Sequence, residues 1–142
     1  MTATFSARLG ESTDSLLRFA MRADAVLTGL AGVLVLPLAG WLASVSGTTT
    51  TIEYALAAFF VGYGVVVFGL STLPRIATAG LAVMAANLLY SVAAVLVVVT
   101  DVWTLTTTGI VLVLATGLYT LVFADLQYVG WRRLRRTSAE RA

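Results

Sequence analysis

The sequence contains no cysteine, no histidine and no lysine, and only 11% of its 142 residues are charged. Without cysteine, the chain has no thiol for disulfide exchange, which excludes the four-helix membrane enzymes that form disulfides. Without histidine, it has no imidazole ligand for haem b or zinc and no histidine general base. We therefore expect no metal site, no cofactor and no catalytic residue, and we predict that the protein is not an enzyme.

Apolar side chains are abundant instead, making up 59% of the residues and giving a mean hydropathy of +0.95. Average globular domains carry roughly 25% charged residues. A soluble chain this short could not hide so much apolar surface, because small proteins have a high ratio of surface to volume. We therefore predict an integral membrane protein whose partner is the lipid bilayer, with residues 1–142 forming a single membrane domain.

The apolar residues fall into four segments, each near the 20 or so residues that a helix needs to cross about 30 Å of hydrocarbon. Glycine and alanine recur along these segments, and such small residues let helices approach closely in a membrane. The predicted fold is all-α, a transmembrane four-helix bundle. Its expected spans are about 25–45, 52–73, 76–99 and 106–128, followed by a cytoplasmic tail at 131–142.

A short amphipathic N-terminal helix is expected before the first span. The polar run Ser12–Ser15 is typical of a helix start, and Leu17 and Met21 then recur at helical spacing. This pattern predicts a helix lying on the inner membrane surface and leading into the first span. The alternative is a simple cytoplasmic extension of that span. Within the span, Pro37 predicts a slight kink.

Basic residues are distributed unevenly between the two sides that these spans define. All nine fall on one side, whereas the outer loops carry only Glu53 and Asp101. Membrane proteins retain positive charge on the cytoplasmic side, so both termini are expected to be cytoplasmic. The nine are Arg8, Arg18, Arg22, Arg75, Arg132, Arg133, Arg135, Arg136 and Arg141.

Several polar residues interrupt the inner part of the predicted bundle. Asp125 is expected about 10 Å from the inner boundary and Asn87 about 16–18 Å from it, counting 1.5 Å per helical residue. Ionisable residues inside a membrane are functional candidates by default. The functional interpretation is a polar site open to the cytoplasm, with Asn87 as its floor. Its candidate residues are Asp125, Asn87, Gln127, Asp24, Arg22 and Tyr128.

A structural interpretation of the same residues is equally specific. Arg22 or Arg75 would reach into the membrane and pair with Asp125. Asn87 would bond a carbonyl or a hydroxyl, such as that of Thr28, across the bundle; such interhelical bonds contribute about 0.6 kcal/mol each. Asp24 alone would be a solvated carboxylate at the start of a helix.

The arginine cluster after the fourth span is expected to bind anionic lipid head groups, at about 1 kcal/mol per charge. Nucleic-acid binding is a more specific alternative. Arginines beside a span more often fix the orientation of the protein in the membrane, so we expect no nucleic-acid partner. The cluster consists of Arg132, Arg133, Arg135 and Arg136.

Three motifs resemble those of small four-span integral membrane proteins of bacteria, of the actinobacterial type. The resemblance covers roughly residues 18–133. It implies a four-helix bundle in the cytoplasmic membrane and supplies no activity. The motifs are Arg22-Ala23-Asp24-Ala25 with Thr28-Gly29 and Gly32, then Asn87-Leu88-Leu89-Tyr90, then Ala124-Asp125-Leu126-Gln127-Tyr128 with Gly130 and Arg132-Arg133.

Two functions remain open from the sequence. The first is a non-catalytic accessory or scaffold subunit of a larger membrane complex or a homo-oligomer, indicated by the small residues on all four helices. The second is a small proton-coupled carrier that uses an inner-side polar site at Asp125. An enzyme acting on lipid or quinone is less supported, because the chain has few groups for acid–base catalysis.

Overall fold

The structure is a computed structural model that describes the backbone of residues 2–142 and the side chains from Asp14 onward. It is built from four helices: α1 (Thr2–Ser46), α2 (Thr50–Leu70), α3 (Ala77–Thr100) and α4 (Thr107–Glu140). Over the described residues, all four are long and apolar enough to cross a membrane. The predicted all-α class and the four membrane-spanning helices are therefore confirmed.

The turns between the helices are fixed by short polar side chains and by one glycine. Thr49 and Thr106 cap α2 and α4, their hydroxyls accepting from the backbone amides of Ile52 (3.2 Å) and Gly109 (3.0 Å). Gly47 has a φ of +81°, and a Cβ there would lie 2.5 Å from a backbone oxygen. The turn after α1 therefore requires glycine.

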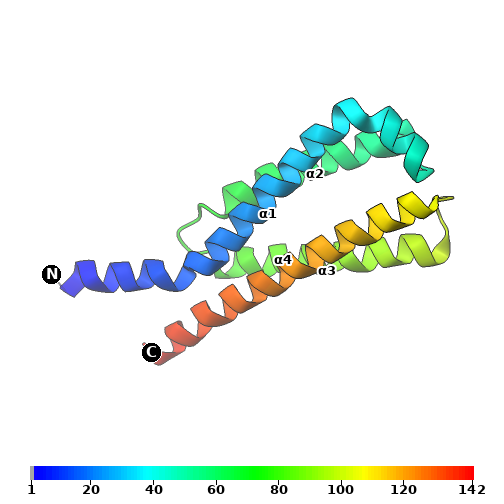
Figure 1. Ribbon diagram of the computed structural model, residues 1–142. Coiled ribbons are helices and arrows are strands. Elements are labelled where there is room, and N and C mark those ends of the chain that lie inside the picture. Colours follow the sequence, from blue (N-terminus) through cyan, green and yellow to red (C-terminus); the bar gives the residue numbers. More distant parts are fainter. Residues whose placement is uncertain (1) are drawn as a thin grey trace.

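The helices form two antiparallel pairs, α1 with α2 and α3 with α4 (Figure 1). Helix α1 also packs along α4, whereas α2 and α3 scarcely touch. The order around the bundle is therefore α2, α1, α4, α3, with a weakly closed side between α2 and α3.

Helix α1 bends over its last turns, beyond Pro37, so that its end approaches the start of α4 (Figure 1). The backbone amide of Thr106 donates to the carbonyl oxygen of Ser46 at 3.0 Å. At the opposite end, a Cβ on Gly130 would lie 2.8 Å from the backbone of Leu17. Helices α1 and α4 are thus held close at both ends.

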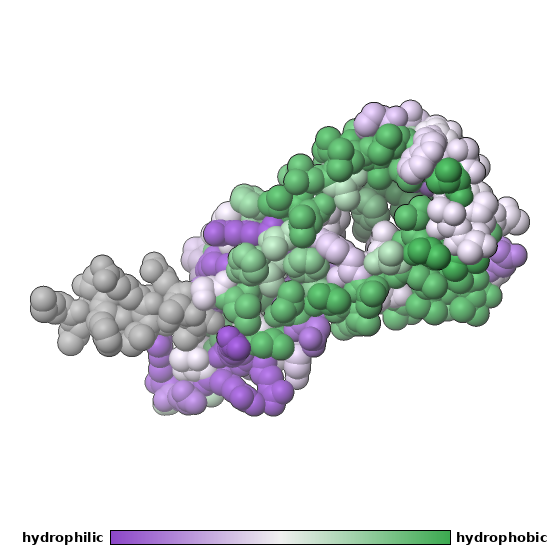
Figure 2. Space-filling model, viewed as in Figure 1, coloured by the Kyte–Doolittle hydropathy of each residue, from purple (hydrophilic) through white to green (hydrophobic). Residues whose placement is uncertain are grey.

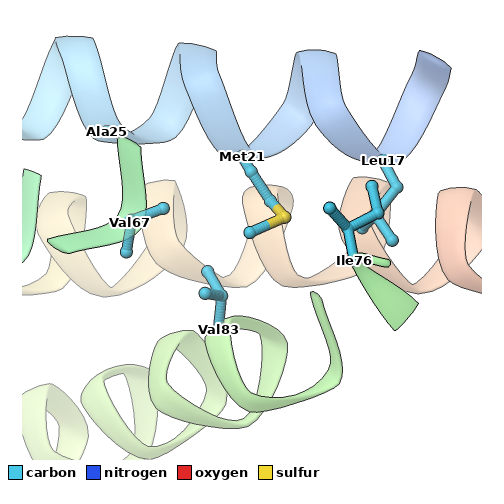
Figure 3. Close-up of a cluster of buried hydrophobic side chains, with 6 residues drawn as sticks. All are labelled: Leu17, Met21, Ala25, Val67, Ile76 and Val83. Carbon is cyan, nitrogen blue, oxygen red and sulfur yellow. The ribbon is translucent and has the colours of Figure 1, made fainter. Parts of the chain in front are cut away.

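The stretch expected to lie on the membrane surface is part of the uninterrupted helix α1. Leu17, Ala20 and Met21 are fully buried, and Leu17 packs against the glycines Gly80 of α3 and Gly130 of α4. The apolar face of this stretch therefore covers other helices, and the alternative of a simple extension of the span describes it better. We call the half of the bundle that carries the C-terminus its inner half and the opposite half its outer half, as names for the two halves only. The inner core that this stretch joins (Figure 3) contains Leu17, Met21, Ala25, Val67, Ile76 and Val83.

The outer surface of the bundle is apolar over its middle and polar at the end that carries the C-terminus (Figure 2). At the polar end, Arg18 pairs with Asp14 at 2.8 Å and donates to the carbonyl oxygens of Ser71 (2.8 Å) and Pro74 (3.2 Å). This arginine therefore ties α1 to the connection between α2 and α3.

Candidate functional site

The carboxylate of Asp24 lies at the centre of the inner half of the bundle and is fully buried. Its Oδ2 accepts from the Tyr63 hydroxyl at 2.7 Å, from Asn87 Nδ2 at 2.8 Å and from Gln127 Nε2 at 3.1 Å. Because these three donors come from α2, α3 and α4, one oxygen atom of α1 joins all four helices.

The other oxygen of Asp24 faces two hydroxyls. Thr28 Oγ1 donates to Oδ1 at 3.1 Å, and the Tyr119 hydroxyl lies 3.3 Å from Oδ1 and 3.2 Å from the Asp24 carbonyl oxygen. The Thr28 and Tyr119 hydroxyls are also 3.1 Å apart. Each hydroxyl has one proton, so these contacts are alternatives that can interchange. We call Asp24, Thr28, Tyr63, Asn87, Tyr119 and Gln127 the Asp24 network.

The donors around Asp24 are all neutral. An ionised carboxylate can only accept hydrogen bonds, and five side-chain donors within reach suit that state. Within the part of the chain whose side chains are described, the one ion pair is that of Arg18 with Asp14. Arg22, two residues before Asp24, is exposed, and its Nε lies 3.3 Å from Ser71 Oγ. The buried carboxylate therefore has no cationic partner among the described side chains.

Close packing of α1 against α2 positions two members of the network. A Cβ on Gly64 would lie 2.7 Å from the Ala25 carbonyl oxygen and 2.9 Å from Gly29 Cα. Only glycine allows the two backbones to approach so closely. This approach brings the neighbouring Tyr63 within hydrogen-bonding distance of Asp24.

A cavity of about 310 Å³ adjoins the Asp24 network on its outer side. Thr28, Tyr63, Asn87 and Tyr119 form one end of this cavity and separate it from the Asp24 carboxylate. The remaining wall is mainly aromatic and aliphatic. Four members of the network are thus both ligands of the carboxylate and walls of the cavity.

A second cavity, of about 420 Å³, occupies the outer half of the bundle. It is lined by the buried carboxylate of Glu53, which accepts from Ser46 Oγ at 3.3 Å and from Thr48 Oγ1. Figure 2 shows the surface hollowed between the outer halves of α1 and α4. The two cavities adjoin, because both are lined by Phe59, Phe60, Tyr90, Leu112 and Thr116.

Three of the predicted site residues meet in the structure, and three do not. Asp24, Asn87 and Gln127 belong to one network, whereas Arg22 lies on the surface near the α2–α3 connection. Tyr128 is 41% exposed and packs near Trp131, with ring centroids 6.3 Å apart.

Asp125 was predicted to lie at the mouth of the polar site, but the structure places it apart from the Asp24 network. It is exposed and makes no hydrogen bond or ion pair with the described side chains, so the expected pairing with Arg22 or Arg75 is absent there. The helical repeat explains the difference, because Ala124 and Gln127 are three residues apart and face the bundle. Asp125, between them, points away.

Other members of the network were missed by sequence reasoning. Tyr63 and Tyr119 were not identified as site residues, and Glu53, which lies outside the network, was counted only among the charges of the outer loops. One signal was available: Leu17, Met21 and Asp24 follow the helical spacing of a single buried face. That face places Asp24 inside the bundle and not among solvated groups.

The arginines expected to bind head groups lie on the last turns of α4. Arg132, Arg133, Arg135 and Arg136 are exposed, and the Arg135 guanidinium lies 5.8 Å from the centre of the Trp131 ring. Their binding to anionic lipid stays a prediction. Among the described residues, no group of three acidic side chains is placed to hold a metal ion.

The chain matches no family model, no curated protein and no solved structure. The resemblance to small four-span bacterial membrane proteins therefore stays a prediction. A functional assignment rests on the chemistry of the Asp24 network and its two cavities.

Proposed function

We propose that this protein is a small, non-catalytic, proton-coupled carrier in which Asp24 is the group that takes up and releases the proton. The observation that supports this most directly is the fully buried Asp24 carboxylate without a cationic partner among the described side chains, next to a cavity of about 310 Å³. Carboxylates inside a membrane are costly, and they typically belong to ion pathways or proton relays.

Protonation of Asp24 would change the hydrogen bonds at the end of the cavity. A protonated carboxyl must donate one hydrogen bond, so one oxygen can no longer accept from all its present donors. Thr28 and Tyr119 lie between Oδ1 and the cavity and already share interchangeable contacts. Their hydroxyls would turn toward the cavity, which couples the proton on Asp24 to the contacts offered to a substrate.

We place the carrier in a bacterial cytoplasmic membrane, with both termini in the cytoplasm. The distribution of the nine arginines and the resemblance to four-span bacterial proteins support this placement. In this orientation the Asp24 network lies in the inner half of the membrane, and Glu53 lies near the outer surface.

An accessory or scaffold subunit is the second candidate, and it too has a specific observation in its favour. No buried side-chain nitrogen or oxygen among the described residues lacks a hydrogen-bond partner. A fully satisfied network joining four helices is also what a structural role requires, since buried polar groups can fix the arrangement of helices. In this reading Asp24 keeps one protonation state, and the protein purifies with a stoichiometric partner.

Infrared difference spectroscopy on the protein in liposomes separates the two candidates. A carrier predicts a protonated-carboxyl band that appears when a proton gradient is imposed across the liposome membrane and that is missing in Asp24→Asn. Asp125→Asn is the matched control, because Asp125 is an exposed carboxylate outside the network, and it should leave the band in place. If no such band depends on Asp24, the carrier proposal is wrong.

A further inference from the structure

We infer that the two adjoining cavities bind a lipophilic organic cation, meaning a molecule with one positive charge enclosed by apolar groups. The inference names a substrate class and rests on the proposed carrier function for its biological role.

The cavities are anionic. Asp24 lies behind the inner end and Glu53 lines the outer cavity, and both carboxylates are buried. Among the described side chains, no arginine lines either cavity. The dielectric constant inside a bundle is low, so these charges act across the cavities with little screening. An anionic ligand is therefore repelled, and a neutral one leaves both carboxylates without a positive partner.

The walls select a large apolar cation over a small hydrated one. Aromatic rings of Phe59, Phe60, Tyr63, Tyr90 and Tyr119 line the inner cavity. Faces of such rings attract cations, most strongly where water is excluded. A metal ion would need several oxygen ligands to replace its hydration shell, and the walls of the inner cavity are mainly apolar.

Access to the cavities is from the sides, between the two helix pairs. The surface is hollowed between the outer halves of α1 and α4 (Figure 2). On the opposite side, α2 and α3 scarcely touch and are bridged by the aromatic contacts of Tyr90 with Phe59 and Phe60, with ring centroids 6.4 and 6.1 Å apart. Side-chain rotation of these rings would admit a molecule already dissolved in the bilayer. Lipophilic cations enter bilayers, so this route suits the same class of ligand. The inner cavity alone falls within the range of roughly 300–1,000 Å³ typical of ligand sites.

The test is equilibrium binding of tetraphenylphosphonium to the purified full-length protein, with uncharged triphenylphosphine oxide as the comparison. The cation should bind the unmodified protein and Asp125→Asn alike. Asp24→Asn and Glu53→Gln should each weaken its binding about tenfold, the loss of one buried opposite charge. The neutral compound should bind weakly and equally to all four proteins.

A further variant that leaves the Asp24 network intact separates loss of cation binding from loss of folding. Ala86 is exposed on α3 and lines the inner cavity, so Ala86→Trp should block the cation while the protein elutes as before from a sizing column. The inference is overturned if the neutral compound binds as tightly as the cation. It is also overturned if neither carboxylate variant changes cation binding.

The inference and the proposed function can fail separately. Cation binding that depends on Asp24, without a gradient-dependent Asp24 band in the infrared spectra, would support the ligand class and rule out proton coupling. A gradient-dependent band without cation binding would support proton coupling at Asp24 and rule out the ligand class.

Discussion

At the scale of single residues, Asp24 differs from Asp125 in what surrounds it and not in which half of the bundle it occupies. Both belong to the inner half of the bundle, but one is fully buried with five side-chain donors around it and the other is exposed on α4. Sequence reasoning preferred Asp125 because it placed the start of the first span at Ala25. The continuous helix α1 begins far earlier, so Asp24 lies well inside the bundle.

Asp24→Asn should lower the free energy of unfolding by only about 1 kcal/mol, the order of one net hydrogen bond. The new amide can turn its NH₂ group toward the Thr28 and Tyr119 hydroxyls, which can accept, and keep its oxygen toward Tyr63 and Asn87. Denaturation in mixed detergent measures the change.

Asp24→Leu should lower the free energy of unfolding by clearly more than Asp24→Asn does in the same assay. It leaves the Tyr63 hydroxyl and the Gln127 amide nitrogen without their acceptor, at a cost of about 1–3 kcal/mol for each, whereas Asn87 Nδ2 keeps Gln127 Oε1 at 3.1 Å. Asp125→Leu is the control and should be close to neutral. Equal effects at the two positions would contradict the placement of Asp24 at the centre of the network.

At the scale of elements, the four helices and their class followed from the hydropathy of the sequence, because each apolar segment is long enough to span a bilayer. Which helices pack against one another could not be predicted from the hydropathy. Small residues recur on every helix, and only some of them mark contacts. Gly64 touches the backbone of α1, whereas Gly62 and Gly69 of the same helix face open space.

This difference predicts opposite results for two similar substitutions in α2. Gly64→Ala should destabilise the protein by about 1–3 kcal/mol, as overpacking does, because its Cβ would lie 2.7 Å from the Ala25 carbonyl oxygen. Gly62→Ala has nothing within 4 Å and should be neutral or stabilise the helix by up to about 1 kcal/mol. Thermal denaturation of the two variants in one detergent compares them directly.

At the scale of the whole molecule, two helix pairs are joined firmly at their inner ends by the Asp24 network and the Leu17 contacts. They are joined again at the outer end through Ser46 and Thr106. Between these junctions lie the cavities. Their existence could not be predicted from the sequence, because the apolar residues that line a cavity are the same types that fill a core.

The proposed orientation is a further property of the whole molecule, and the absence of cysteine makes it simple to measure. A single cysteine at Thr50, next to the outer turn, should react with a membrane-impermeant maleimide in intact cells. A cysteine at Ala142 should react only after the membrane is made permeable. The reverse pattern would place the arginine-rich end outside.

Asp24 is proposed to exchange its proton for a cation held in the adjoining cavities. The decisive measurement adds tetraphenylphosphonium to the purified protein in weakly buffered solutions of decreasing pH and records the pH change on binding. At the acidic end of this series, where Asp24 carries its proton, binding should release protons from the unmodified protein and from Asp125→Asn, and none from Asp24→Asn. Binding of the cation to the unmodified protein that releases no protons anywhere in the series would rule out proton exchange at Asp24.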